Sequence, residues 1–268
     1  MGDLLISSNQ ALVSIVTPAY NVEKLIGKTI ESVLRQTIQH WELVIVDDCS
    51  KDSTRDIVAS YAANDARIRL IALDKNHGAP AAPRNIGVRD ARGRWIAFLD
   101  ADDIWHPEKL ALQLAAADST SARFISSQMK DFCDDSNLRF LPVDSASVGA
   151  VTFRQQRIKG RIPTSSVLVS RELMLAFPFN EDIRYKAVED YHCWMRILAS
   201  GVEHRKVQYP LLSYRRIEGQ ISGSKRYMVE RMHMLHREFP NTSALQAAIF
   251  TFTHALGGFY YRILRKGL

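Results

Sequence analysis

The acidic run Asp100-Ala101-Asp102-Asp103 is the part of this sequence whose residue types point most directly to chemistry. It follows the apolar stretch Trp95–Leu99, so three carboxylates stand at the end of a strand that we expect to be buried. Carboxylates in such a place repel one another and are costly to desolvate unless a cation compensates them. Aspartate oxygens suit Mg²⁺ and Mn²⁺, which commonly bridge carboxylates to a substrate diphosphate.

A structural use of the same acids competes with this interpretation. Asp102 or Asp103 could cap the helix that we expect to begin near Pro107. A single Asp would leave the two interpretations equal. Three acids at a strand end, in a chain that carries a second acidic pair at Asp47-Asp48, favour a nucleotide-diphosphate site.

Apolar strands and amphipathic helices alternate through the first half of the chain. Strands separated by helices predict βαβ units and a parallel sheet covered on both faces. In such sheets ligands bind beyond the carboxyl ends of the strands. Thr17, Asp47-Asp48, Asp74 and Asp100 fall at those ends. The expected strands are 13–16, 41–46, 68–73 and 95–99, and the expected helices are 23–36, 53–64 (with Ser53 as its cap) and 84–91.

The second half is less regular. Its expected strands are 124–127, 163–169, 202–207 and 211–215, and its expected helices are 191–199, 224–238 and 244–265. The last helix carries apolar residues at a spacing of three to four, but polar residues such as Gln246, Thr251 and His254 dilute it. We therefore expect a helix that packs on the core or lies at an interface, and not one that spans a membrane.

The bulk composition is that of a globular protein, with 268 residues, 46% hydrophobic and 24% charged. Cys49, Cys133 and Cys193 form no CxxC pair, which favours reduced thiols in a cytoplasmic protein and argues against a zinc site. The residues from Met1 to Ile6 lack the basic and long apolar regions of a signal peptide, so we expect a cytoplasmic location.

Charge is concentrated near the C-terminus. Residues 205–268 hold eleven Lys/Arg and three Glu, a sum of +8 against +6 for the whole chain, so residues 1–204 sum to −2. A basic tail predicts an anionic partner, which could be membrane lipid, a lipid-linked diphosphate or nucleic acid. We expect peripheral contact with the inner face of the cytoplasmic membrane; packing on the catalytic domain, or on a second subunit in a homodimer, is the alternative.

Five segments in this order and at this spacing resemble the family 2 glycosyltransferases, which have a GT-A fold. They are Val16-Thr17-Pro18-Ala19-Tyr20-Asn21, Val44–Asp52, Ala82–Gly87, Phe98–Asp103 and Val188-Glu189-Asp190. The resemblance spans residues 13–215 and is closest to enzymes of bacterial surface-polysaccharide (O-antigen or capsule-type) assembly. It implies a mixed, mainly parallel α/β sheet flanked by helices. The expected catalytic domain is 1–215, with a nucleotide-sugar half at about 13–105 and an acceptor half at about 106–215. Residues 216–268 then form a basic helical extension.

The resemblance also assigns a donor site. Tyr20 is expected to present its ring to the base, and Asp48, slightly favoured over Asp47, to accept the N3–H of uracil. Arg84 is expected to reach the base or the diphosphate; the alternative is a solvated Arg at a helix start. Asp102 matches the metal position of the DxD motif, with Asp100 near the donor ribose or sugar, and the metal would be Mn²⁺ or Mg²⁺. The remaining residues expected in the nucleotide-sugar site are Thr17, Ala19 and Ala101.

By the same resemblance Asp190 is the general base that deprotonates the acceptor hydroxyl, and neighbouring carboxylates would raise its pKa. Glu189 or Trp194 is expected to shape the acceptor site. Thr164, just after Pro163, either lines this site or simply begins a strand. Many members carry a His after a Tyr-Arg pair, whereas Arg216 follows Tyr214-Arg215 here. Arg215 or Arg216 is therefore expected to contact the diphosphate, and Arg215 is also a candidate on the acceptor side.

These residues predict an inverting, metal-dependent enzyme. It would move one sugar from a nucleotide sugar to a hydroxyl of a glycan or polyprenyl-diphosphate-linked acceptor. The expected donor is a UDP-linked hexose or N-acetylhexosamine. No G-x-G-x-x-G exists, which argues against a dehydrogenase, and Val22 stands where a P-loop needs its first Gly. The remaining alternatives are a sugar nucleotidyltransferase and a non-catalytic binder of nucleotide sugars or nucleic acid.

Overall fold

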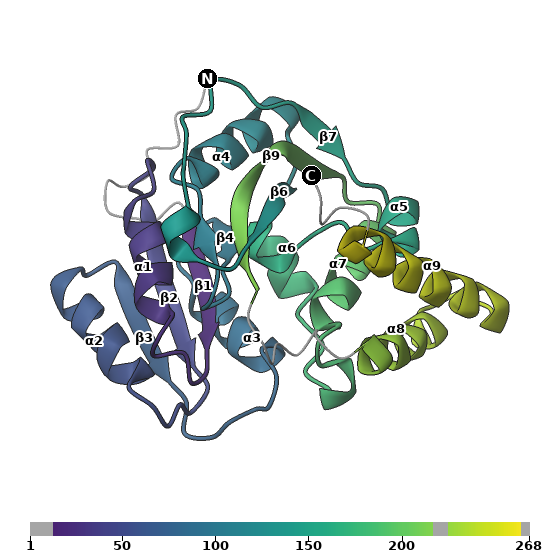
Figure 1. The fold of residues 1–268 in the computed structure, drawn as a ribbon, viewed down its shortest axis with the longest axis horizontal. Helices are drawn as coiled ribbons and strands as arrows, with labels where there is room; N and C mark the ends of the chain where they lie inside the picture. Colours follow the sequence, from purple (N-terminus) through teal and green to yellow (C-terminus); the bar gives the residue numbers. More distant parts are fainter. Residues whose placement is uncertain (1–12, 217–224, 264–268) are drawn as a thin grey trace.

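The first four strands form a parallel sheet with the order β3-β2-β1-β4 (Figure 1). The computed structural model describes residues 13–216 and 225–263, and the side chains of residue 225 and of residues 257–263 are outside the description. The strands are continuous apolar runs because helices cover both faces, and every residue of β2 is buried. Their bounds are β1 Val13–Ala19, β2 Trp41–Asp47, β3 Ile68–Ala72 and β4 Trp95–Phe98.

The sheet continues beyond β4 with mixed strand directions. β8 runs antiparallel to both β4 and β6, and β6 and β9 form a long parallel pair. β5 and β7 each lie antiparallel to β9, which brings the described strands to nine in one sheet. The α/β fold with a flanked, mixed sheet is therefore confirmed. The bounds are β5 Ile104–Trp105, β6 Phe124–Phe132, β7 Val148–Ala150, β8 Leu168–Ser170 and β9 His204–Arg215.

Two apolar cores lie on opposite faces of the sheet. One is closed by α1, α2 and α4, through residues such as Ile30, Val58 and Leu110. The other is closed by α3, α6 and α7, through residues such as Val88 and Trp194. The helices are α1 Ile26–Leu34, α2 Thr54–Asn64, α3 Ala81–Asp90, α4 Lys109–Thr120, α5 Phe153–Ile158, α6 Arg171–Ala176, α7 Glu189–Ala199, α8 Lys225–Glu238 and α9 Ala244–Ile263, with short 3-10 turns η1 Asp135–Asn137, η2 Thr164–Ser166 and η3 Ile183–Tyr185.

The last two helices pack beside the sheet at the C-terminal end of the chain (Figure 1). Met232 and Leu235 of α8 and Phe239, which follows this helix, join a third apolar cluster. Its other members include Val188, which precedes α7, and Met195 within α7. α9 contacts α8 and α5. Within the described ranges, no helix is long and apolar enough to cross a bilayer. Met1–Ile6 and the basic residues Arg265 and Lys266 lie outside the described residues.

Several boundaries differ from the sequence predictions for physical reasons. β1 continues through Pro18, which pairs with Val46 on one side only, because the pairing of β1 with β4 ends at Val16 opposite Phe98. A proline without N–H is tolerated where no ladder partner is present. The strand predicted for 163–169 begins only at Leu168, since η2 turns the chain through 164–166.

Two further predictions were wrong. The strands predicted at 202–207 and 211–215 are one strand, β9, because a bulge near Gln128 absorbs the extra residues around Pro210. Ser53 makes no side-chain cap on α2, and Asp52 accepts the Thr54 N–H instead, at 3.0 Å.

Candidate active site

The predicted donor residues gather at the carboxyl ends of β1, β2 and β4. Asp48 lies beside β1 because its backbone N–H donates to the Ala19 carbonyl at 2.8 Å. Tyr20 is 48% exposed at this edge, whereas Thr17 and Ala19 are buried below it. The ring of Tyr20 is thus open to a ligand, while Thr17 and Ala19 shape the backbone that presents it.

Asp47 and Asp48 differ in what they contact. Asp47 is fully buried, and its carboxylate is held by the guanidinium of Arg55 and accepts the Ser50 N–H at 3.1 Å. Asp48 is 5% exposed at the strand end. Its carboxylate accepts the backbone N–H of His77 at 3.0 Å and lies 2.7 Å from the His77 Nδ1. Asp47 therefore fixes the loop that follows β2, whereas the carboxylate of Asp48 is turned toward His77.

His77 is a contact of Asp48 that the sequence did not reveal, because nothing near it in the sequence distinguishes it from a surface histidine. It is half-buried and contacts Asp48 across 29 positions of sequence. The signal was the turn Asn76-His77-Gly78 after β3, in which Gly78 has a φ of 75°. Such a left-handed residue follows His77 and lets the chain fold back toward Asp48.

Arg84 joins the two halves of the site. Its guanidinium lies 2.7 Å from the Asp100 carboxylate at the end of β4 and 2.9 Å from the Glu189 carboxylate at the start of α7. Arg84 is 4% exposed, so the interpretation as a solvated helix-start arginine is wrong. The two carboxylates raise the pKa of Arg84 despite its burial. Removing one member of such a buried ion pair typically destabilises a protein by about 3–5 kcal/mol.

The close approach of α3 to the sheet places Arg84 there. Gly87, one turn later on the same helix, packs against β1 so closely that a Cβ would lie 2.5 Å from Cγ1 of Val16. The absence of a side chain at Gly87 therefore allows α3 to pack closely on the sheet. It lets the first turn of α3 sit deep enough for Arg84 to reach Asp100 and Glu189.

Glu189 and Asp190 open α7 with different environments. Glu189 is buried, and burial, reinforced by the neighbouring charge of Asp190, raises its pKa to about 7 although Arg84 favours the charged form. Asp190 is half-exposed, and its carboxylate accepts the Thr164 hydroxyl at 2.6 Å. The structure thus brings Asp190, Glu189 and Thr164 together, and Asp190 is the acid open to a substrate.

The acidic run after β4 is held by neighbouring backbone groups. The Thr29 hydroxyl lies within 3.0 Å of the carbonyl oxygens of Ala101 and Asp103. Asp103 is fully buried and accepts the Arg215 N–H at 3.0 Å, and its pKa is well above the usual range because of burial and the nearby charges of Asp102 and Asp100. The first residue before α4 is Glu108, so neither Asp102 nor Asp103 caps that helix.

Asp100 and Asp102 are the partly exposed acids of this run. A cation beside them would offset the repulsion that raises the pKa of Asp103. In the described part of the chain, no three Asp, Glu, His or Cys side chains are grouped closely enough to hold a metal alone. The residues fit an ion that takes its other oxygens from a diphosphate and water, a common arrangement for Mg²⁺.

Two residues predicted near the acceptor or the diphosphate, Trp194 and Arg215, are buried. Trp194 is fully buried among Phe98, Phe124 and Phe179, so it belongs to the core and lines no open surface. Arg215 is 3% exposed; its Nε donates to the Asp102 carbonyl at 2.7 Å, and its guanidinium lies 2.7 Å from Asp135. Arg215 positions the acidic run in this structure.

Comparison with known proteins decides the family. The model of glycosyl transferase family 2 matches residues 14–196, a range that includes Tyr20, Asp48, Arg84, Asp102 and Asp190. The chain belongs to glycosyl transferase family 2. It is therefore a glycosyltransferase, and the nucleotidyltransferase and non-catalytic alternatives are set aside.

Relatives of similar length support this assignment. TuaG of Bacillus subtilis (strain 168), named for teichuronic acid biosynthesis, is 32% identical over 88% of this chain and 91% of its own. WfgD of Escherichia coli, named as a UDP-Glc:alpha-D-GlcNAc-diphosphoundecaprenol beta-1,3-glucosyltransferase, is 32% identical over 80% of this chain and 81% of its own. Among solved structures, S. aureus TarS 1–349 in complex with UDP-GlcNAc is similar with a TM-score of 0.69 at 23% identity, covering 95% of this chain and 74% of TarS. The GT-A fold predicted from the sequence is thus confirmed.

Proposed function

We propose that the chain is a metal-dependent, inverting glycosyltransferase that moves one sugar from a UDP-sugar to a hydroxyl group of an acceptor. The observation that carries this proposal is the bridge made by Arg84. It fixes Asp100, at the donor end of β4, to Glu189, which is adjacent to Asp190. The donor side of the site at Asp100 and the proposed base Asp190 are thereby held at fixed positions relative to each other, which a direct displacement requires.

The preference for UDP rests on Asp48. Its carboxylate presents only acceptor oxygens, which suit the N3–H of uracil; cytosine has no such hydrogen. Tyr20 supplies an exposed ring for the base, and the imidazole of His77 orients the carboxylate. WfgD is named for a UDP-Glc donor, and TarS has been solved with UDP and with UDP-GlcNAc. A UDP-linked hexose or N-acetylhexosamine is the proposed donor class.

Asp102 is the proposed metal ligand, with Asp100 next to it. A bound Mn²⁺ or Mg²⁺ would stabilise the negative charge that develops on the departing diphosphate. A mannosyltransferase from Pyrobaculum calidifontis with a similar fold, at a TM-score of 0.65, has been solved with GDP-Man and Mn²⁺. Arg215 and Thr29 keep Asp102 in place through its own and the adjacent backbone.

Asp190 is the proposed base. Its carboxylate takes the proton of the acceptor hydroxyl while that oxygen attacks the anomeric carbon, and Thr164 holds the carboxylate by the 2.6 Å hydrogen bond. The ion pair of Glu189 with Arg84 keeps the adjacent acid from competing for the acceptor. One base and one displacement invert the anomeric configuration.

The proposed setting is polysaccharide biosynthesis, with a glycan or polyprenyl-diphosphate-linked acceptor, on the cytoplasmic side of the membrane. It is supported by the names of TuaG, WfgD and the amylovoran biosynthesis glycosyltransferase AmsB of Erwinia amylovora, which is 30% identical over 75% of this chain and 68% of its own. We retain the division into a catalytic domain at 1–215 and a helical extension at 216–268 as part of this proposal.

A thermal-shift screen tests the donor assignment. We expect UDP with Mn²⁺ to raise the melting temperature more than ADP, GDP or CDP, since a ligand at about 100 times its Kd adds about 2.7 kcal/mol of stability. Asp48→Asn should narrow the UDP-over-CDP preference, because its amide can donate to cytosine N3. Asp56→Asn, an exposed acid on α2, is the matched control and should keep the preference. Equal shifts with all four nucleotides would contradict the uracil contact.

A further inference from the structure

The 3-10 turn η2 contacts both the acidic run and the proposed base. Thr164, its first residue, donates its hydroxyl hydrogen to the Asp190 carboxylate at 2.6 Å. The hydroxyl oxygen of Ser165, its second residue, accepts the backbone N–H of Asp100 at 3.0 Å. Two consecutive residues of one turn therefore reach the two halves of the site. This connection is separate from the ion pairs of Arg84.

The η2 segment also contacts the chain on both sides of the acidic run. Before the run, the Phe98 N–H donates to the Val167 carbonyl at 3.3 Å. After it, the Trp105 Nε1 donates to the Ser165 carbonyl at 2.7 Å. The Ser165 hydroxyl reaches into the run itself, at Asp100. The acidic run is thus held by η2 before, within and after its four residues.

Buried side chains of α4 hold η2 in place. Ser165 is only 2% exposed, and Ser166 is fully buried. The Gln113 Nε2 donates to the Ser166 carbonyl at 2.7 Å. Lys109, which the proposed mechanism does not use, donates its Nζ to the Gln113 Oε1 at 2.7 Å, and both side chains are fully buried. These contacts fix the backbone that carries the Ser165 hydroxyl.

We propose that Ser165 is a positioning residue for the metal site. Its hydroxyl holds the backbone at Asp100, so that the carboxylates of Asp100 and Asp102 stay in the positions from which they can bind a divalent ion together with the donor diphosphate. Ser165 acts through Asp100 and does not bind the ion itself. Groups that support metal ligands in this way typically contribute 10- to 100-fold to metal affinity. The inference rests on the proposed function, because it concerns the metal that this function requires.

A purely structural role for the Ser165 hydroxyl is the alternative, and Ser166 provides the comparison. Both serines are buried in the same turn. The Ser166 hydroxyl donates to the Pro163 carbonyl at 2.7 Å, a contact within the segment of η2 itself. Loss of either hydroxyl should lower the melting temperature by a similar amount, since one buried hydrogen bond is lost in each case. Only the loss at Ser165 should change the affinity for a metal.

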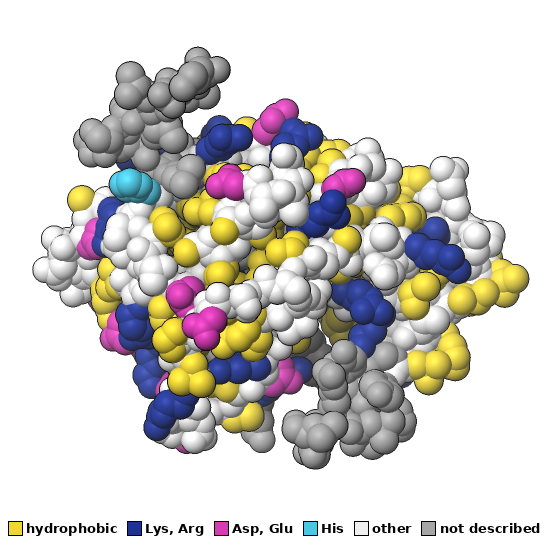
Figure 2. Space-filling view, turned by 90° about the horizontal axis from the view of Figure 1, so that it is seen from above, with side chains coloured by type: hydrophobic (Ala, Val, Ile, Leu, Met, Phe, Trp, Pro, Cys, Tyr) yellow, Lys and Arg dark blue, Asp and Glu magenta, His cyan; other side chains and the backbone are white. Residues whose placement is uncertain are grey.

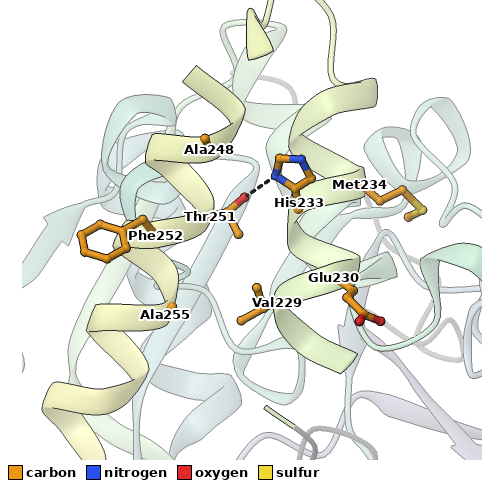
Figure 3. A pocket seen from close by; sticks show the side chains of 8 residues that line it. All are labelled: Val229, Glu230, His233, Met234, Ala248, Thr251, Phe252 and Ala255. Atoms are coloured by element: carbon orange, nitrogen blue, oxygen red, sulfur yellow. Dashed lines mark hydrogen bonds between the residues drawn. The ribbon is translucent and has the colours of Figure 1, made fainter. Parts of the chain in front are cut away.

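A second comparison lies in the groove between α8 and α9. Thr251 is 7% exposed, and its hydroxyl donates to the Ala247 carbonyl at 2.7 Å and lies 3.4 Å from the His233 Nδ1 (Figure 3). The residues that line this groove belong to α8 and α9. These helices form the end of the molecule where Figure 2 shows hydrophobic side chains at the surface. The Thr251 hydroxyl is thus a buried hydroxyl that supports neither η2 nor the acidic run.

The Mn²⁺ concentration at which UDP stabilisation of the full chain is half-maximal tests the inference. Each variant is melted with a fixed excess of UDP and increasing Mn²⁺, and the shift is taken from its own melting temperature without Mn²⁺. We expect Ser165→Ala to require about tenfold more Mn²⁺ than the wild type. Ser165→Cys keeps the side-chain volume but has a weak acceptor, so it should change the requirement in the same direction even if the Ala variant fails to fold.

The controls are Ser166→Ala and Thr251→Val, which should require as much Mn²⁺ as the wild type does. A wild-type requirement in folded Ser165→Ala or Ser165→Cys would overturn the inference. An equal increase in Ser166→Ala would also overturn it, because the stability of the turn and not the Ser165 hydroxyl would then set the metal affinity. Stabilisation of the wild type by UDP without any dependence on Mn²⁺ would reject the metal in the proposed function and the inference with it, whereas the other two outcomes reject the inference alone.

Discussion

Asp190→Asn is expected to slow the chemical step by about 10²–10⁴-fold while donor affinity changes little. Asn keeps the shape of the side chain and can still receive the Thr164 hydroxyl, but it cannot take up the proton of the acceptor. The measurement is single-turnover sugar transfer at saturating donor, together with a titration of UDP binding.

A matched variant makes this result specific. Asp182→Asn removes the charge of an exposed acid that pairs with Arg184, and it should transfer at the wild-type rate. Loss of donor affinity in Asp190→Asn with an unchanged rate of the chemical step would assign Asp190 to donor binding and leave the base unidentified.

Asp102→Ala is expected to abolish measurable transfer, a loss of at least about 10³-fold, because stabilisation of the departing diphosphate by a metal amounts to several kcal/mol. Excess EDTA should have the same effect on the wild type, and added Mn²⁺ should restore the rate. Steady-state transfer before and after chelation is the measurement.

The control for Asp102 is Asp118→Ala, an exposed acid on α4. It should keep both activity and its response to EDTA. Circular dichroism should show Asp102→Ala to be folded, since the variant keeps the hydrogen bonds that Thr29 and Arg215 make to the backbone of the acidic run and the one that the Asp103 carboxylate accepts. Full wild-type activity in excess EDTA would remove the metal from the mechanism.

The nucleotide half of the fold was predictable because its signals are local. Each of the strands β1–β4 is a short apolar run. Polar residues, such as Asp47 and Asp100, mark where these runs end. Register could not be predicted in the second half, where a bulge near Gln128 merges two expected strands into β9.

The sequence could not reveal which residues of the site contact one another, because the partners are far apart along the chain. Arg84 and Glu189 are 105 positions apart, and Asp48 and His77 are 29 apart, so no spacing rule connects them. Trp194 was misassigned because it follows the acidic pair closely in sequence, although the turn of α7 directs it into the core.

The anomeric configuration of the product tests the central claim most directly. The purified chain would be given Mn²⁺, the UDP-sugar that stabilises it best, whose sugar is linked in the α configuration, and an acceptor with a free hydroxyl. Proton NMR of the product would then report the new linkage. The mechanism with Asp190 as the single base predicts a β-linked product. An α-linked product, or no transfer from any UDP-sugar, would contradict it.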